Sequence, residues 1–432
     1  MILPPSSESA CTRAYALVTR HRLAQVLARL VDVPSPTGEE VGLARDMVAL
    51  MGECGISAHE QHVQGQQSNA VGSLGGKGIG RSLLLYAPID TVTSNSADED
   101  LPWSAEALRP DMRAVSWREG DIVFGLGAQN PKGHAACILV AAEALAASAA
   151  PLAGELRLGF GAGGMPTNSR PGLPPDTGHG VGCAHMLRTG SSKPDFAVIA
   201  KTGWFVSWEE VGLAWYEIRV RGTHTYVGSR HLLPYVNAIA QAARVVERLE
   251  AWFPTWSESH RSGLVAPQGI VAFIEGGTER TAAFTPAECR IRIDLRLSPR
   301  TTLEQADHAI DQILGEIAND EKVDLSWLRV VAVPGTTTSP DNWIIRSSIA
   351  AWEDVAGRPH QPVLGLSGAT DANILRGHDI PTARVGLPKA PIEGIDFQLG
   401  MNAAYLPHME NLTKLLIRVA LATCNSEGKL DG

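Results

Sequence analysis

The chain has 432 residues, of which 44% are hydrophobic and 19% are charged, and its formal net charge is -9. This length exceeds one ordinary hydrophobic core, so it predicts at least two domains. The acidic balance and the scattered placement of Lys and Arg argue against nucleic acid or an anionic membrane surface as a partner. No stretch approaches about 18 uninterrupted apolar residues, so no transmembrane helix is predicted.

The start of the chain and the cysteines indicate the compartment. The opening stretch, "MILPPSSESACTRAYALVTRHR", lacks the charged-then-apolar order of a secretory signal. Six cysteines are scattered along the chain without a CxxC pair, a pattern typical of reduced thiols. We therefore expect a cytoplasmic protein.

The first part of the chain alternates helices with strands. Residues 22–32 have helical spacing, and Thr37 followed three residues later by Glu40 is a capping-box signature for a helix over roughly 38–53. The run "SLLLYAPID" is short and wholly apolar before it reaches Asp90. Such a run predicts a strand that is covered on both faces.

A second and a third buried strand follow the same pattern. The loop "GLGAQN" leads into a long Ala-rich helix from about Pro131, "GELRLGFGAGGMP" is a strand that ends in glycines, and "PDFAVIA" is a strand that ends at Lys201. This alternation predicts a mostly parallel α/β sheet with helices on both faces. Because such sheets bind ligands at the carboxyl ends of their strands, we expect a site that includes Asp90 and Lys201.

The pattern changes near residue 210. Residues 212–333 read as β-α-β-β-α-β, the ferredoxin-like split unit. After this unit we predict a helix over 340–355, then a strand, a loop and a helix start in "QPVLGLSGATDANIL", a strand in "IPTARVGL" and a closing helix over 408–424. The prediction is therefore an α/β domain made of residues 1–210 and 334–432, with an inserted α+β lid or dimerisation domain over 211–333.

Several short motifs occur in a characteristic order, among them "SPTGEE", "GLGAQNPKG", "GELRLGF", "RVRGTHTY", "FIEGGTERTAAFTPAECRIRIDLRLSP" and "SGATDANIL". Their order and the inserted lid resemble the dinuclear-zinc peptidase family M20, over about residues 20–425. That family includes acetylornithine deacetylase, succinyl-diaminopimelate desuccinylase, aminoacylase and carboxypeptidase G. The resemblance implies cleavage of a C–N bond in a small acyl-amino-acid-like molecule and a homodimer formed through the lid.

The resemblance also implies a metal site, which this sequence does not retain. The family holds two zinc ions with two His, a bridging Asp and further Asp or Glu ligands, and a separate Glu activates the water. The corresponding positions here are Pro88, Asn130, about Gly163–Met165 and Lys201. The last His position falls near residues 402–406, where only His408 is nearby. We therefore predict that the dinuclear zinc site is lost and that the protein has no cofactor.

A single relocated metal ion is the alternative to that prediction. It would use His134, His179 or His408, but none of these shows zinc-ligand spacing.

Lys201 is the most informative replacement. The resemblance places it where a metal lay, within reach of Asp90, so its ammonium would supply the lost positive charge. A desolvated lysine next to Asp90 can act as a base or a nucleophile. The structural alternative is that Lys201 only neutralises Asp90 in an inactive pocket. Asn130 would hydrogen-bond a substrate carbonyl or, alternatively, shape its loop.

The further candidates are substrate-binding residues, and each has a structural alternative. Tyr226 and His224 on the lid would complete a site across a dimer, and Thr370 lies in a loop that contacts substrate in the family or caps a helix, for which Asp371 is the better candidate. Arg296 and His408 complete the set, although Arg296 suits a structural ion pair better. The expected structural roles are a core histidine for His134, pairing for Lys132 and a Gly-rich turn for "GHGVGCAH".

These residues favour three hypotheses. The first is a metal-independent enzyme related to amidohydrolases and deacylases, in which Asp90, Lys201 and Asn130 act on a small amide by hydrolysis or by a lyase or isomerase reaction. The second is a non-catalytic protein that binds a ligand or a partner. The third is a conventional zinc-dependent deacylase with a rebuilt metal site.

Overall fold

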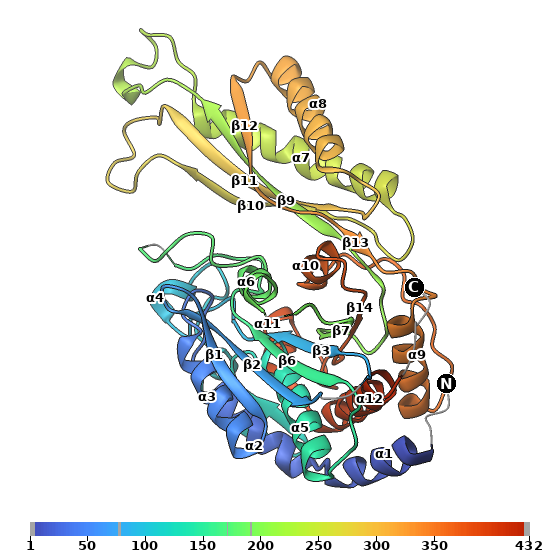
Figure 1. Ribbon diagram of the computed structural model, residues 1–432. Helices are drawn as coiled ribbons and strands as arrows, with labels where there is room; N and C mark the ends of the chain where they lie inside the picture. Colours follow the sequence, from blue (N-terminus) through green and yellow to red (C-terminus); the bar gives the residue numbers. More distant parts are fainter. Residues whose placement is uncertain (1–4, 77–78, 171, 191, 427–432) are drawn as a thin grey trace. The chain divides into compact units, whose positions relative to one another are not determined.

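The computed structural model describes residues 5–76, 79–170, 172–190 and 192–426, and Figure 1 shows its ribbon. The chain divides into two compact units. The first comprises Met1–Trp208, Thr338–Pro362 and Thr370–Gly432, and the second comprises Glu209–Thr337 and Val363–Ala369. Within the described residues, no helix is both long and apolar enough to span a membrane.

A six-stranded sheet forms the centre of the first unit. Its order is β1 (Ser57–Gln64), β2 (Gln67–Gly75), β6 (Glu155–Gly161), β3 (Leu83–Pro88), β7 (Phe196–Ala200) and β14 (Thr382–Val385). The last four strands are parallel to one another, whereas β2 is antiparallel to both β1 and β6. The predicted mostly parallel sheet is confirmed, and an unpredicted hairpin, β1–β2, extends one edge.

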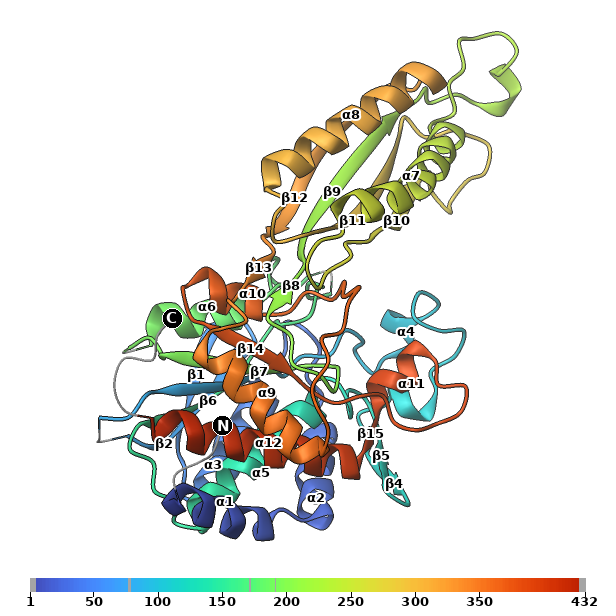
Figure 2. The ribbon, with the colours of Figure 1, turned by 90° about the vertical axis from the view of Figure 1, so that its right-hand side faces the viewer.

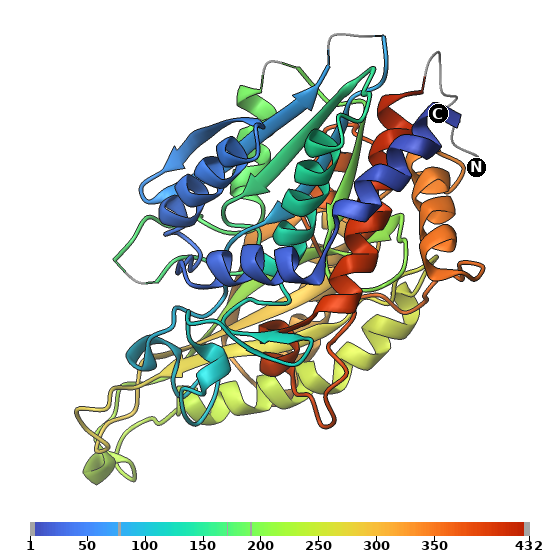
Figure 3. The same ribbon diagram turned by 90° about the horizontal axis from the view of Figure 1, so that it is seen from below.

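Helices cover both faces of this sheet, as Figures 1 and 3 show. One face carries α1 (Pro5–Leu17), α2 (Arg20–Val31), α3 (Val41–Glu53), α5 (Lys132–Ala147), α9 (Trp343–Ala356) and α12 (Leu406–Cys424). The other carries α6 (Val181–Thr189) and α10 (Ala372–Gly377). Strand β3 shows why both faces are covered: Leu83 and Leu85 belong to the larger core, and Leu84 and Tyr86 belong to the smaller one.

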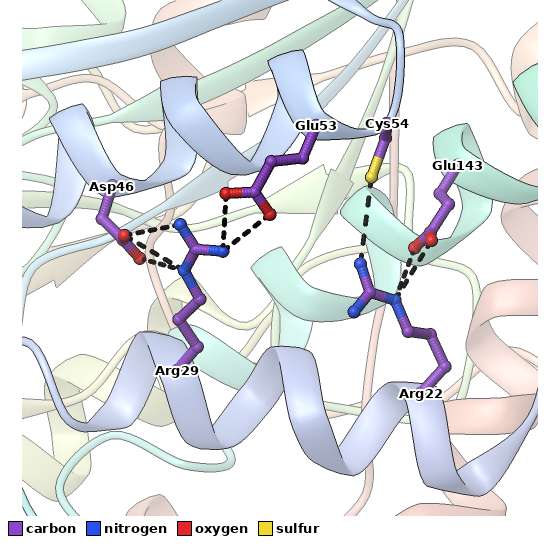
Figure 4. A network of polar contacts seen from close by, with 6 residues as sticks. All are labelled: Arg22, Arg29, Asp46, Glu53, Cys54 and Glu143. Atoms are coloured by element: carbon purple, nitrogen blue, oxygen red, sulfur yellow. Dashed lines mark hydrogen bonds and ion pairs between the residues drawn. The ribbon is translucent and has the colours of Figure 1, made fainter.

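Helix α2 is tied to its neighbours by two arginines, which Figure 4 shows from close by. Arg29 forms ion pairs with Asp46 and Glu53 of α3. Arg22 pairs with Glu143 of α5 at 2.9 Å. These partly exposed pairs fix the orientation of the helices and add little net stability.

Shorter elements lie next to the carboxyl ends of the parallel strands. They are α4 (Ala97–Asp100), the 3-10 helix η1 (Pro110–Met112), β4 (Trp117–Glu119), β5 (Ile122–Phe124), α11 (Phe397–Asn402) and β15 (Ala403–Tyr405). Strand β15 pairs with β5, which pairs with β4. This small sheet brings the segment around residue 400 next to the loop that precedes α5.

The second unit has the predicted β-α-β-β-α-β order: β9 (Gly212–Arg221), α7 (Ala238–His260), β10 (Gly269–Gly276), β11 (Glu288–Leu297), α8 (Leu303–Glu321) and β12 (Leu325–Val333). Its sheet is antiparallel, with the order β10-β11-β9-β12. Helices α7 and α8 pack on one face and enclose a separate core, as Figure 2 shows. Short strands β8 (Glu209–Glu210) and β13 (Thr336–Thr337) and the 3-10 helix η2 (Val227–Ser229) complete the unit. The ferredoxin-like prediction is confirmed.

Three local predictions are wrong. Helix α3 begins at Val41 and Thr37 with Glu40 forms no capping box, because both side chains bind elsewhere. Residues 361–366 form no strand; only Leu366 pairs, in an isolated bridge with Val265. The segment taken as a Gly-rich turn continues into α6 directly after Gly180, whose φ of 86° only glycine adopts readily.

Candidate active site

The candidate site lies at the carboxyl ends of the parallel strands in the first unit. Asp90 follows β3, the loop of Gly163, Gly164 and Met165 follows β6, and Lys201 follows β7. The backbone of Lys201 continues the sheet, because its N–H donates to the Val385 carbonyl of β14 at 3.1 Å. The fold thus brings together three of the sequence-predicted positions.

Asp90 is fully buried, and three donors hold its carboxylate. The hydroxyl of Thr37 donates to Oδ2 at 2.7 Å, the N–H of Gly164 donates to Oδ1 at 2.8 Å, and the N–H of Met165 donates to Oδ2 at 3.0 Å. Burial raises the pKa of Asp90, and the Thr37 hydrogen bond and the Lys201 charge oppose that rise. Asp90 is therefore positioned rigidly and does not face solvent.

Glu40 is a second buried carboxyl group, which the sequence pattern assigned to a helix cap. Its Oε1 accepts hydrogen bonds from the N–H of Gly38 at 3.1 Å, from the N–H of Gly163 at 2.9 Å and from Nε2 of Gln67 at 3.3 Å. Burial raises the pKa of Glu40 to about 8, and the charge of Asp90 adds to this rise. The site thus contains a second acid that the sequence analysis missed.

Lys201 is only 8% exposed. Its ammonium contacts Sδ of Met165 at 3.6 Å, and Met165 is also one of the residues that bind Asp90. The charge of Lys201 acts on Asp90 and, less strongly than burial, lowers the pKa of His134. Lys201 and Asp90 therefore both contact Met165, and the charge of Lys201 acts on Asp90.

His134 and Lys132, both on α5, have structural roles here. Nε2 of His134 accepts the N–H of Leu387 at 3.1 Å, and burial lowers the pKa of this fully buried imidazole, so it is neutral. His134 is a core histidine as predicted, but it is satisfied only at Nε2, because its buried Nδ1 has no hydrogen-bond partner among the described residues. Lys132 donates to the carbonyl of Val33 at 2.7 Å instead of pairing with an acid, and burial lowers its pKa to about 7.

Asn130 directly precedes Pro131, the N-cap residue of α5. Its side chain is 7% exposed, its Nδ2 contacts Sδ of Met401 at 3.4 Å, and its backbone N–H donates to the Met401 carbonyl. Among the residues that the structure describes, its Oδ1 has no hydrogen-bond partner. Asn130 lines a cavity of about 70 Å³ together with Thr91, which directly follows Asp90.

A larger cavity of about 400 Å³ adjoins the small one and shares Val92 and Trp103 with it. Thr37, whose hydroxyl binds Asp90, lies in its wall. Arg170 also lines this cavity and forms ion pairs with Glu39 and Glu99, which line it as well. A ligand of moderate size thus has space beside the strand end that carries Asp90.

Asp371 and Thr370 precede α10, and the capping hydrogen bond is made by Thr370 and not by Asp371. Asp371 occupies the N-cap position without a capping hydrogen bond from its side chain, and Oδ2 instead accepts the Tyr86 hydroxyl at 2.5 Å. The hydroxyl of Thr370 accepts the N–H of Ala372 at 3.2 Å. The expected N-cap by Asp371 is therefore wrong, and Thr370 caps the helix.

The remaining candidates do not join this cluster within the first unit. In the second unit, Nδ1 of His224 lies 2.8 Å from the Thr285 carbonyl, Tyr226 is half exposed, and Arg296 pairs with Asp294 at 2.9 Å. Arg296 thus has the structural ion pair that was the alternative to substrate binding. His408, on α12, packs edge-on against Tyr405, and burial lowers its pKa.

The residues present do not fit the dinuclear zinc centre that the resemblance implies. Within the described ranges, no three His, Cys, Asp or Glu side chains lie together in a metal-binding group. The positions that the resemblance equates with ligands carry Pro88, Asn130, Gly163–Met165 and Lys201. None of these side chains is an imidazole, thiolate or carboxylate donor of the kind that zinc needs. A Cβ added at Gly164 would lie 2.3 Å from Cβ of Pro88 and 2.7 Å from Oδ2 of Asp371, so this position has no room for a side chain.

Comparison with known proteins gives the family context. Residues 209–322 match the family model of the M20 peptidase dimerisation domain. N-formyl-4-amino-5-aminomethyl-2-methylpyrimidine deformylase of Bacillus subtilis (strain 168) is 24% identical over 323 residues, which are 71% of this chain and 69% of that protein.

Two solved structures align over nearly the whole chain. Human carnosine dipeptidase 1 covers 98% of this chain and 100% of its own, with a TM-score of 0.73 and 12% identity. Aminopeptidase PepT from Bacillus cereus covers 94% and 99%, with a TM-score of 0.65 and 16% identity. At these identities the alignments show the fold alone.

Proposed function

Because the chain belongs to the M20 peptidase family by its dimerisation domain and its fold, we propose that it removes a small acyl group from a nitrogen atom without using a metal ion. Cleavage of a C–N bond agrees with the deformylase relative. The misfit between the donor set and zinc supports a reaction that uses only side chains. The second unit would join two subunits, with Tyr226 and His224 available to a partner's site.

The observation that carries this proposal is that buried Lys201 and Asp90 both contact Met165 at the ends of the parallel strands. Once Lys201 has taken up a proton, its positive charge lies where the resemblance places a metal, and Asp90 is held by Thr37 and by two backbone N–H groups. A preorganised charge at a largely buried position stabilises charge that develops in a transition state far better than water does.

In the proposed hydrolysis, Lys201 in its amine form takes a proton from a water molecule whose oxygen bonds to the acyl carbon. The C–N bond then breaks, and Lys201 returns the proton to the leaving nitrogen. Asp90 stabilises the lysine while it carries the proton. Asn130 binds the amide of the substrate beside them.

The test measures formate released from N-formylbenzylamine by the full-length protein in the presence of EDTA. Lys201→Met keeps an unbranched side chain of similar size but removes the amine, and it should lower the rate by about 100-fold or more. The matched control is Lys193→Met, because Lys193 is exposed and pairs with Asp379. An unchanged rate in Lys201→Met, or a rate that EDTA abolishes and zinc restores, would contradict the proposal.

A binding protein without catalytic activity is the second candidate. The complete burial of Asp90 favours it, since a carboxylate held by three donors and shielded from solvent suits a fixed scaffold. Binding of N-formylbenzylamine without any formate release would establish this second candidate and reject the first.

A further inference from the structure

The small cavity at Asn130 has a composition that selects its ligand. It is lined by the strand end at Thr91–Thr93, by Trp103, by the loop before α5 and by helix α11. As the described residues form it, the lining includes no Asp, Glu, Lys, Arg or His. A charged group would therefore lose its hydration there without gaining a partner, so the cavity suits an uncharged group.

The Asn130 side chain adds a polar requirement. Its Oδ1 is buried and lacks a hydrogen-bond partner among the described residues, although buried polar atoms are nearly always paired. The carboxamide offers an acceptor on one side and a donor on the other, and the present donor contact, to Met401, is a weak one to sulfur. Either orientation of the carboxamide pairs with a substrate amide, which carries both an N–H and a C=O.

The size of the cavity limits what enters it. Its volume is about 70 Å³, whereas a cavity of about 150 Å³ takes up a benzene ring. An aromatic ring or a long chain is therefore too large, and a group of two or three heavy atoms fits. The adjoining cavity of about 400 Å³ leaves space for the rest of a molecule whose small end lies against Asn130.

We propose that this cavity is an acyl pocket, which holds a formyl or acetyl group against the carboxamide of Asn130, and that Met401 sets the maximum length of the acyl chain. The inference deepens the proposed function and rests on it for the identity of the ligand as an amide. Met401 is the natural limit because its sulfur contacts Asn130 and its side chain forms part of the wall.

The experiment measures dissociation constants by ligand-observed NMR for benzylamine carrying N-formyl, N-acetyl, N-butanoyl or N-hexanoyl groups. The wild-type chain should bind the formyl and acetyl compounds at least about tenfold more tightly than the hexanoyl compound, the scale on which pockets discriminate by size. Met401→Ala should remove that preference or reverse it. Asn130→Ala should weaken binding of the formyl compound by about tenfold.

Met186→Ala is the matched control. Met186 is a buried methionine that lines a different cavity, between α6 and the β1–β2 edge of the sheet. The Met186→Ala variant should bind the four compounds in the same order of affinity as the wild-type chain. Equal binding of all four compounds by the wild-type chain, no binding of any of them, or an unchanged preference in folded Met401→Ala would overturn the acyl pocket.

The same titrations separate this inference from the proposed function. Tight, length-selective binding without formate release retains the acyl pocket and rejects hydrolysis. Release of benzylamine at similar rates from all four compounds retains hydrolysis and rejects the acyl pocket.

Discussion

Glu40 and Asp90 are two buried carboxyl groups bound by consecutive N–H groups of one loop. Gly163 donates to Glu40 at 2.9 Å, and Gly164 and Met165 donate to Asp90 at 2.8 and 3.0 Å. Ionising both carboxyl groups at once is unfavourable in a buried site, because the two negative charges repel each other. Because Lys201 and Thr37 favour the charged form of Asp90, Glu40 is the group that keeps its proton at neutral pH.

The first prediction concerns the pH dependence of stability. Burial, followed by the charge of Asp90, raises the pKa of Glu40 to about 8 from its ordinary value of 4.5, so the folded state binds a proton more tightly than the unfolded state. The stability from this group is complete below pH 4.5 and is lost as the pH rises toward 8, at up to about 1.4 kcal/mol per pH unit. Glu40→Gln should flatten the fall in the free energy of unfolding over this range, measured by urea titration. An equally steep fall in the variant would contradict the assignment.

The second prediction concerns Asp90→Asn. Both carboxylate oxygens accept a backbone N–H. In asparagine one of these oxygens becomes an NH₂ group, so a hydrogen-bond donor of the side chain would point at a backbone N–H donor. This change should cost about 1–3 kcal/mol of unfolding free energy. Thr37→Val removes one of three donors and leaves the carboxylate in place, so it should cost less. A larger loss of unfolding free energy in Thr37→Val than in Asp90→Asn would show that the hydrogen bonds from Gly164 and Met165 contribute less than the one from Thr37.

The third prediction concerns Tyr86 and Asp371, which join β3 to α10. The Tyr86 hydroxyl donates to Oδ2 of Asp371 at 2.5 Å, and both residues are buried. Tyr86→Phe should lower the free energy of unfolding by about 1–3 kcal/mol, because it removes a buried hydrogen bond to a charged group. Tyr216→Phe is the comparison: Asp307 keeps its ion pair with Arg329 at 2.6 Å after that change. Its cost should be smaller.

The fourth prediction concerns metal content. Protein purified without a chelator and dialysed against zinc should carry close to no bound zinc when examined by mass spectrometry. The physical reason is that an ammonium and two glycines occupy positions that the resemblance equates with zinc ligands, and that Pro88 and Asp371 fill the space a side chain at Gly164 would need. A content of about two zinc ions per chain, the family's complement, would show that other residues rebuild the centre.

The apolar strands and the lid were predictable because their patterns are strong. "LLLY" in β3 and "FAVIA" in β7 are wholly apolar, and they are buried on both faces. Strand β1, "SAHEQHVQ", was missed because it lies at the sheet edge with a mostly polar, partly exposed surface. Such a strand is formed by pairing with β2 and not by burial, so no hydrophobic period reveals it.

Within the candidate site, the sequence predicts only the residues that directly follow a buried parallel strand. Asp90 and Lys201 were identified because parallel strands place their ends together. Glu40 and Thr37 were assigned to a helix cap, since the S/T-x-x-E pattern suits that role equally well. Thr37 instead binds Asp90, which lies 53 residues away in the chain, and Glu40 binds the N–H of Gly163, which lies 123 residues away. Contacts over such distances depend on the packed fold and leave no local signal.

The discontinuity of the first unit has a consequence for biosynthesis. Strand β14 and helix α12 belong to the core of the first unit, yet they follow the entire second unit along the chain. A ribosome therefore releases all the strands and helices of the lid before the larger core has its last strand or its closing helix. The lid can reach its native pairing during translation, whereas the larger unit has to wait with apolar surface exposed. Chaperone demand during synthesis should thus fall on the first 200 residues, although they emerge first.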